Sequence, residues 1–251
     1  MKVIALGVGE WRDGIHPNNS HLVISGDTSI LLDCGRGVPE QLRKLDKGGD
    51  WPDAVYLSHD HPDHCCGLVP LLSWGWHYGR KKAITIICRR TLAEFMTKVV
   101  ELAYYYETGN FNFPILFADI SADMESGFDF NGLGLKFAPT NHSVDNLAVR
   151  IDDGSHVVCY SGDGEPTAAS AKLYHKADLL IHEGFSCDTP QAGHGFIPNV
   201  ITVAEQQQVG TLWLTHLQKE FRQTDLLQVK HQITSQTVKV VIPEPLHEFV
   251  A

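Results

Sequence analysis

Residues 57–68, which read LSHDHPDHCCGL, restrict what this chain can be more than any other segment. Four candidate metal ligands, His59, His61, Asp63 and His64, fall within six positions. Histidine is the commonest metal ligand in proteins, and carboxylates accept many of the same divalent ions. The segment can be a metal-binding turn, a metal site that also uses the two cysteines, or a polar loop rich in histidine. The choice depends on what the rest of the chain supplies.

Short apolar segments alternate with helix candidates along the 251 residues, and no low-complexity segment divides them. The apolar runs predict strands over 2–8, 21–25, 29–33, 54–58, 83–88, 133–138, 146–151, 156–160, 178–182, 211–215 and 237–242. Segments bounded by Gly, Pro or Asn predict helices over 37–46, 66–78, 167–175 and 199–208, and helical periodicity predicts another over 91–105. Early antiparallel hairpins followed by strand–helix alternation indicate one α/β domain over 1–251 with mixed sheets.

The helix candidate 91–105 has the clearest periodicity. Helical spacing predicts that one face packs into the core, through Leu92, Phe95, Met96, Val99 and either Leu102 or Ala103.

Polar residues stand at the carboxyl ends of four predicted strands. The histidine-rich turn follows one strand, and three other strands lead to His142, Asp163 and His216. In open α/β sheets this edge is where functional sites are built. Two zinc ions need about six protein ligands and a bridging group, and the turn with these three residues can supply them. Asp163 lies between two glycines, so its carboxylate can approach both ions.

The charge and the cysteine content of the chain limit the partners and the cellular location that can be expected. The chain has 20 basic and 30 acidic residues, a formal charge of −10, which is the wrong sign for unaided attraction to a nucleic-acid backbone. Six cysteines are scattered without a disulfide framework, and the N-terminal sequence is not that of a signal peptide. We therefore expect a cytoplasmic protein with reduced thiols and no association with membranes.

The order of these pieces resembles the metallo-β-lactamase superfamily, through SHDHPDH at 58–64, His142, SGDG around Asp163, His216, and LLDCG at 31–35. The resemblance covers essentially the whole chain and implies a four-layer αβ/βα fold, with two mixed β-sheets packed between helices. It also implies two divalent metal ions, zinc or alternatively manganese or iron. By position, one ion has the ligands His59, His61 and His142, the other has Asp63, His64 and His216, and Asp163 bridges them. Asp33 matches an early aspartate that orders the ligand loops.

Two further clusters, IHEGFS at 181–186 and AGHGF at 192–196, resemble the ribonuclease Z and phosphodiesterase branch. The match is by position, since the motifs read HEG and HGF instead of the branch's HEA and HST. It implies that His194 is a general acid oriented by Glu183, that Asp63 belongs to the catalytic group, and that a metal-bridging hydroxide is the nucleophile. The tRNA-processing members carry a long basic arm between the residues that match His142 and Asp163. Only residues 143–162 lie between them here.

The expected function is a dinuclear metal-dependent hydrolase, a phosphodiesterase acting on a small or short substrate, with tRNA disfavoured. The alternatives are hydrolysis of a thioester, lactone, sulfate ester or β-lactam at the same site, or a ribonuclease Z-like RNA endonuclease. A metal- and nucleic-acid-binding protein without activity ranks last. Relatives of this kind are often dimers, so a homodimer is also considered.

For several residues the sequence allows two interpretations of their role. Trp74, Trp76 and Tyr104–Tyr106 can wall a substrate pocket or pack in the core, and Arg36, Arg89 and Arg90 can clamp a phosphate or lie solvated. Cys65 and Cys66 are expected to pack at the start of a helix instead of binding metal. Pro62 is expected to disfavour a helix directly after His61.

Overall fold

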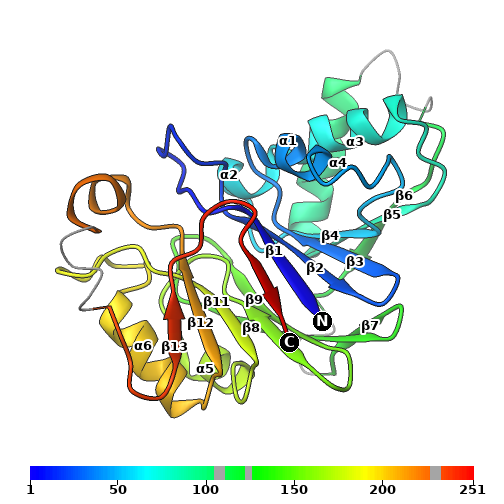
Figure 1. The fold of residues 1–251 in the computed structure, drawn as a ribbon. Helices are drawn as coiled ribbons and strands as arrows, with labels where there is room; N and C mark the ends of the chain where they lie inside the picture. Colours follow the sequence, from blue (N-terminus) through cyan, green and yellow to red (C-terminus); the bar gives the residue numbers. More distant parts are fainter. Residues whose placement is uncertain (105–110, 122–125, 227–232) are drawn as a thin grey trace.

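The computed structural model of the chain describes residues 1–104, 111–121, 126–226 and 233–251. Within these ranges, fourteen strands form two mixed seven-stranded sheets, and helices cover the outer face of each sheet (Figure 1). The expected α/β fold with two mixed sheets between helices is therefore confirmed.

The first sheet has the strand order β14-β1-β2-β3-β4-β5-β6. Its strands are β1 (Lys2–Gly7), β2 (Ser20–Ser25), β3 (Thr28–Leu32), β4 (Ala54–Tyr56), β5 (Ile84–Cys88), β6 (Ile115–Asp119) and β14 (Glu248–Val250). Strands β1 to β3 are antiparallel, and β2 turns into β3 at Gly26, whose φ of 56° lies in the left-handed region that glycine adopts at least cost. Strands β3 to β6 run parallel.

The second sheet has the strand order β13-β12-β11-β10-β9-β8-β7. Its strands are β7 (Phe128–Phe130), β8 (Leu133–Pro139), β9 (Leu147–Asp152), β10 (Val157–Tyr160), β11 (Leu179–Glu183), β12 (Thr211–Thr215) and β13 (Lys239–Val241). Strands β7 to β10 are antiparallel neighbours, and β10 to β13 run parallel.

The outer layers are made of helices that connect parallel strands. They are α1 (Val38–Arg43), α2 (Pro62–Cys65), α3 (Leu68–His77), α4 (Arg90–Ala103), α5 (Ala168–Leu173) and α6 (Ile197–Gln206), with a π-helical turn at Phe221–Asp225. Helices α1, α3 and α4 lie on the first sheet, whereas α5 and α6 lie on the second (Figure 1). The two chain termini lie near each other, because β14 pairs with β1.

The apolar runs of the central strands are explained by burial on both faces. In β1, Val3 and Ala5 pack between the two sheets, while Ile4 and Leu6 pack against the helices. Successive side chains of a strand point to opposite faces, so a strand covered on both sides must be apolar throughout.

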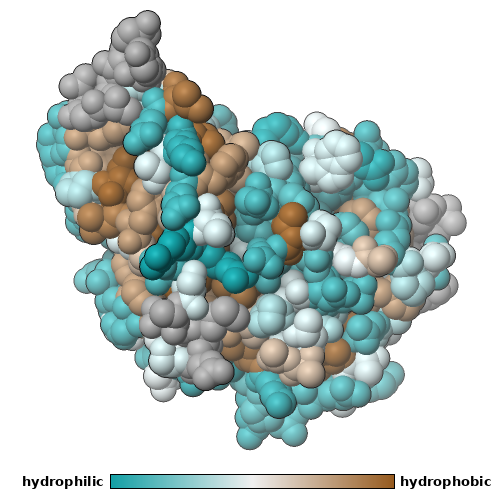
Figure 2. Space-filling view, turned by 180° about the vertical axis from the view of Figure 1, so that it is seen from behind, coloured by the Kyte–Doolittle hydropathy of each residue, from teal (hydrophilic) through white to brown (hydrophobic). Residues whose placement is uncertain are grey.

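Helix α4 departs from its predicted pattern. Leu92, Met96 and Val100 are buried as a one-sided stripe, but Phe95 and Leu102 are exposed. Phe117 of β6 is also exposed, and Figure 2 shows apolar surface on the lobe that carries α4 and β6. The stripe is therefore narrower than the spacing predicted.

Three strands were not predicted. Strands β6, β7 and β14 are short or lie at sheet edges, where exposed positions dilute the apolar pattern. Helix α2 begins at Pro62, so the expectation that this proline disfavours a helix was wrong: proline lacks only an N–H that the first turn does not need. Within the described ranges, no helix has the length and hydropathy of a membrane span.

Candidate metal centre

The histidine-rich turn connects β4 to α2. His59 and His61 lie in the extended segment before the helix, and Asp63 and His64 lie in its first turn. Because Asp63 and His64 lie on a helical turn, their side chains point in directions different from those of His59 and His61 in the extended segment. The turn therefore presents two pairs of side chains to two different places.

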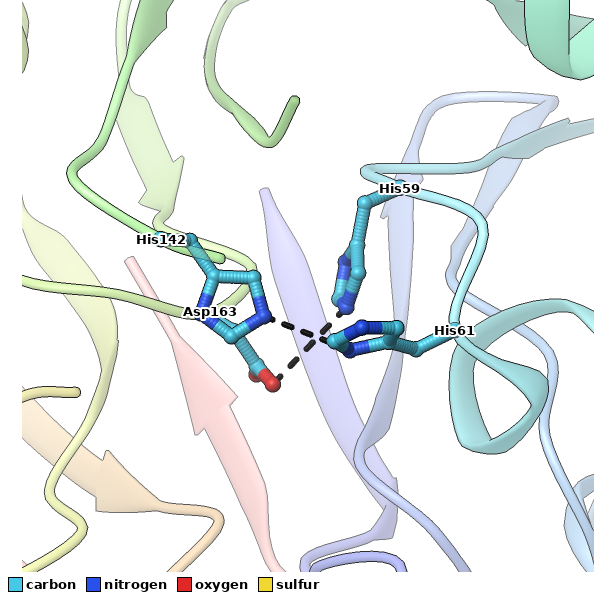
Figure 3. Close-up of side chains that lie close together, drawn as sticks. All are labelled: His59, His61, His142 and Asp163. Carbon is cyan, nitrogen blue, oxygen red and sulfur yellow. Dashed lines mark hydrogen bonds and ion pairs between the residues drawn. The ribbon is translucent and has the colours of Figure 1, made fainter. Parts of the chain in front are cut away.

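The first cluster contains His59, His61, His142 and Asp163, whose candidate ligand atoms all lie within 4.8 Å of one another. Figure 3 shows these side chains converging from both sheets. Nε2 of His142 lies 3.3 Å from Nδ1 of His61, and Nε2 of His59 lies 3.8 Å from Oδ2 of Asp163. Outside the cluster, Nδ1 of His142 donates to the carbonyl oxygen of Gly193 at 2.8 Å, which leaves Nε2 free of a proton to face the centre.

The second cluster contains Asp63, His64 and His216. Oδ2 of Asp63 lies 3.5 Å from Nε2 of His64 and 3.3 Å from Nε2 of His216. His216 follows β12 with a φ of 53°, in the left-handed region that a side chain other than glycine rarely adopts. This backbone turn directs its imidazole back over the sheet edge.

Asp163 touches residues of both clusters. Its Oδ1 lies 3.3 Å from Nε2 of His64, and its Oδ2 lies 3.5 Å from Nε2 of His216 and 3.8 Å from Nε2 of His59. The neighbouring glycines are required sterically. A Cβ on Gly162 would lie 2.3 Å from Oδ1 of Asn146, and both Gly162 and Gly164 have positive φ values of 61° and 103°.

Asp33 supports the second cluster through a hydrogen bond to the nitrogen of His64 that faces away from the cluster. Oδ2 of this buried carboxylate accepts hydrogen bonds from Nδ1 of His64 at 2.7 Å, from Ser58 Oγ at 2.7 Å and from Tyr160 Oη at 2.6 Å. Asp33 itself has a φ of 56° at the end of β3. A donor bond from Nδ1 fixes the tautomer of His64 with its Nε2 lone pair toward the centre.

Glu183 connects His216, a candidate metal ligand, to His194. Its Oε1 lies 2.8 Å from Nδ1 of His194 and 3.2 Å from Nδ1 of His216, and its Oε2 accepts the N–H groups of Gly164 and Gly195. Burial disfavours charge on His194, but the hydrogen bond that its Nδ1 donates to the Glu183 carboxylate outweighs burial and raises the pKa of His194 above its usual value.

The donor set fits divalent metal ions. Nε2 of His59, Nε2 of His64 and Oδ1 of Asp163 are buried and have no hydrogen-bond partner within the described residues. Buried polar atoms without a partner are costly, and a cation among them would satisfy all three. Burial opposes charge on His64, yet the nearby Asp163 and Asp33 carboxylates raise its pKa. The same negative field would stabilise a bound cation.

The residues that the sequence predicted for the site lie together at one edge of the two sheets: Asp33, His59, His61, Asp63, His64, His142, Asp163, Glu183, His194 and His216.

The sequence did not predict three residues that support the site through hydrogen bonds: Ser58, Tyr160 and Asn146. Asn146 donates to the carbonyl oxygen of Asp163 at 2.9 Å. They hold the ligands through hydrogen bonds between distant strands, and no sequence motif marks such bonds.

The structure also places the aromatic residues, cysteines and arginines for which the sequence allowed two roles. Trp74 is buried in the core cluster on the helix-covered side of the first sheet, and Trp76 and Tyr104 are partly buried against that cluster. Residues 105 and 106 lie outside the described ranges. Cys65 is buried as expected, but Cys66 is exposed, so its predicted packing role was wrong. Arg89 and Arg90 pair with Asp145 and Asp119, whereas the Arg36 guanidinium donates to the backbone oxygens of Asp13 and His16.

Known proteins share the sequence and the fold of this chain. The profile of the family described as anti-Pycsar protein Apyc1 matches residues 1–239. The probable metallo-hydrolase YhfI of Bacillus subtilis is 30% identical over 240 residues, which cover 86% of this chain and 87% of YhfI. The crystal structure of YhfI, a metallo-β-lactamase fold protein, matches with a TM-score of 0.82 and 26% identity over 99% of this chain and 98% of YhfI.

The crystal structure of human tRNase Z, short form, matches with a TM-score of 0.80 over 100% of this chain and 99% of that one. At 21% identity this likeness shows the shared fold. The fold and the histidine–aspartate clusters thus define a metal-dependent hydrolase of the metallo-β-lactamase fold, with ribonuclease Z among its relatives. Within that class, the chain belongs to the anti-Pycsar protein Apyc1 family.

Proposed function

We propose that this chain is a dinuclear phosphodiesterase that acts on a small or short substrate. The observation that carries the proposal is the pair His194–Glu183, joined at 2.8 Å beside the metal-ligand clusters. The His194 ring lies 5.4 Å from that of His142, between ring centroids, and its side chain is 29% exposed, so a substrate can reach it. A positioned proton donor beside a cation site suits the departure of an oxygen leaving group.

The protein's own groups have distinct tasks in this reaction. Nδ1 of His194 donates to Glu183, so Nε2 is the atom that can deliver a proton to the leaving oxygen. Glu183 also bonds to His216, so one carboxylate aligns the proton donor with the second cluster. His194 supplies the proton, and Glu183 stabilises the charged imidazolium that precedes the transfer.

The proposed metal ligands divide as the two clusters do. His59, His61 and His142 would hold one ion, Asp63, His64 and His216 the other, and Asp163 would bridge them. Divalent ions there would lower the pKa of a coordinated water toward about 7 and neutralise charge on the phosphoryl oxygens. Zinc is our first choice, and manganese and iron are alternatives, because imidazole and carboxylate ligands accept all three.

A small substrate is favoured over tRNA. The segment between His142 and Asp163 contains the antiparallel pair β9–β10 and no arm, and the chain has a formal charge of −10. Clamping a folded RNA needs an extended basic surface. The short hairpin and acidic charge provide neither.

The test is metal-dependent hydrolysis by the purified protein, stripped with a chelator and reloaded with zinc, manganese or iron. We expect cleavage of bis-p-nitrophenyl phosphate, lost in His61→Ala and Asp163→Ala. His194→Ala should keep its metal content and lose activity by about 10²- to 10⁴-fold. Two bound ions without turnover of any phosphodiester would reject the proposal.

A substrate panel separates the alternatives. A thioester, a lactone, an aryl sulfate, a β-lactam and a precursor tRNA are compared with the phosphodiester under the same conditions. Faster turnover of one of these would assign the site to that bond. RNA binding that persists without turnover and survives His194→Ala would support a protein without activity.

A homodimer and a cytoplasmic location complete the proposal. All six cysteines are free thiols, which suits a reducing compartment. Sedimentation analysis of the metal-loaded protein measures the oligomeric state.

A further inference from the structure

A cavity of about 700 Å³ opens directly beside the metal-ligand turn. It shares His61 and Asp63 with the two clusters, whereas His142 and His194 are absent from its lining. A group bound in it would lie against the metal site on a side other than the one that His194 serves. No sequence motif marks this cavity, because one of its walls is the loop between β1 and β2.

That loop presents Trp11 at the cavity, with 68% of the residue exposed. The loop is nevertheless held firmly. Buried Glu10 accepts the N–H of Arg12, and buried Asp13 accepts the N–H groups of Ile15 and His16. The protein thus uses two buried carboxylates to fix a loop that leaves a large aromatic ring in solvent, which is the arrangement of a preformed binding surface.

The indole of Trp11 is supported from its own loop. The Arg12 guanidinium lies 5.6 Å from the centre of the Trp11 ring and is held by both carboxylate oxygens of Glu220, at 3.2 and 3.0 Å. Such a cation–ring contact limits the motion of the ring. The ring therefore needs little ordering when a ligand arrives.

The opposite wall is mostly apolar and bears little charge. It consists of Pro39 of α1, Pro62 of α2, Pro70 of α3 and the exposed thiol of Cys66. Apart from His61 and Asp63 at the metal-ligand turn, the charged residues that line the cavity are one cation, Arg36, and one anion, Glu40, which offset each other. The Arg36 guanidinium already donates to two backbone oxygens. These walls suit a neutral, flat apolar group and offer little to a second charged group.

We propose that this cavity, the Trp11 pocket, binds the ester group that the substrate keeps after cleavage, and that this group is an apolar ring. This inference rests on the proposed phosphodiesterase function. Trp11 would stack on the ring while the phosphoryl group lies at His61 and Asp63. The leaving group would extend toward His194, which explains why His194 lies outside the pocket.

The test compares two substrates with the same leaving group, methyl p-nitrophenyl phosphate and phenyl p-nitrophenyl phosphate. We expect the phenyl ester to have the higher kcat/KM in the wild-type protein. Trp11→Ala should lower the phenyl-to-methyl ratio of kcat/KM by about tenfold. Ile15→Ala is the matched control, because Ile15 is 71% exposed on the same loop and does not line the pocket. Equal phenyl-to-methyl ratios in the wild type and Trp11→Ala would overturn the inference.

A measurement without turnover separates this inference from the proposed function. Alkylation of Cys66 by iodoacetamide is followed by peptide mass spectrometry, with partly exposed Cys187 as the internal reference. Diphenyl phosphate should slow the alkylation of Cys66 at least about fivefold, a modest stacking contribution, whereas dimethyl phosphate should not, and the protection should disappear in Trp11→Ala. If neither ester is hydrolysed, the proposed function fails, and protection of Cys66 still decides whether the pocket binds aromatic esters. Equal protection by both phosphates would overturn the pocket.

Discussion

Nδ1 of His64 lies 2.7 Å from Oδ2 of Asp33, and both side chains are inaccessible to solvent. The same oxygen accepts the hydroxyl of Tyr160 from the second sheet at 2.6 Å. His64, a candidate metal ligand beside the first sheet, is therefore oriented by Asp33, which in turn is held by Tyr160 across the interface between the sheets. Metal-ligating histidines depend on such outer partners for their tautomer and orientation.

Removing the Tyr160 hydroxyl should weaken metal binding in the second cluster. In Tyr160→Phe, Asp33 loses one of its hydrogen-bond donors, so the position of its carboxylate under His64 is less restrained. We expect the affinity for one of two metal ions to fall by about tenfold, the lower end for outer-partner substitutions. Competition with a chromophoric chelator measures both affinities without requiring a substrate.

Tyr56→Phe is the matched control for that measurement. Tyr56 is also a fully buried tyrosine between the sheets, but its hydroxyl donates to the carbonyl oxygen of Leu147. Its loss should lower the free energy of unfolding by about 1 kcal/mol and leave both metal affinities unchanged. Equal affinities in Tyr160→Phe and Tyr56→Phe would remove the orienting role assigned to Tyr160.

The sequence predicted the candidate ligands because they form motifs, and it missed their supports because those form no motif. His59, His61, Asp63 and His64 are neighbours in the chain, and the distant ligands follow strands whose ends meet at one edge. Tyr160, by contrast, is an ordinary aromatic residue within a β-strand until the two sheets pack and bring it to Asp33. The Trp11 pocket was missed for a similar reason: loop conformation depends on buried carboxylates that no periodicity reveals.

Replacing Glu183 by glutamine should move the alkaline limb of the pH–rate profile to lower pH. Burial favours neutral His194, and the Glu183 carboxylate reverses this and raises the pKa of His194. Without the negative charge the imidazolium loses its proton at lower pH, so the general acid is active over a narrower range. We expect a shift of about one pH unit or more in kcat/KM.

His194→Ala provides the reference for the Glu183→Gln profile. That variant has no proton donor at this position, so its residual rate should lack the limb altogether. An unchanged limb in Glu183→Gln would assign the alkaline pKa to a group other than His194.

Chelation of metal should destabilise the fold. The buried atoms of His59, His64 and Asp163 that lack partners would lose the cation that satisfies them. Each ion bound at a thousandfold excess over its Kd contributes about 4 kcal/mol, so removal of two ions should lower the melting temperature by roughly 20 °C. Thermal unfolding with and without chelator measures this shift, and Asp163→Ala should show a much smaller one. Identical melting curves in the wild type would exclude bound metal under those conditions.

The sequence predicted the buried central strands better than the exposed elements at the edge of the first sheet. In β11, Leu179, Leu180 and Ile181 are buried in succession, so the apolar run marks this strand clearly. Strand β6 has exposed Leu116 and Phe117, and helix α4 exposes Phe95 and Leu102, so apolar residues there do not report burial. Hydrophobic pattern predicts which residues prefer the interior, but the docking of the whole element decides which of them reach it.

His21 should make the stability of the fold depend on pH. It is fully buried between the sheets, with Nε2 donating to Oδ1 of Asn19 at 2.9 Å, and burial lowers its pKa to about 3. Its Nδ1 has no hydrogen-bond partner in the described part of the chain, so protonation would bury an unsatisfied charged donor. The usual pKa of about 6.5 applies in the unfolded chain.

Between these two values the unfolded chain binds one more proton than the folded protein at this residue, so stability is full above about pH 6.5 and falls as the pH decreases. The loss is at most about 1.4 kcal/mol per pH unit, or about 2 kcal/mol at pH 5. Urea unfolding at pH 7 and pH 5 measures it, and His21→Leu should lose less stability over that interval than the wild type. Other buried histidines titrate in both proteins, so the difference between the two pH dependences isolates His21. Parallel pH dependences would show that His21 is not the group responsible.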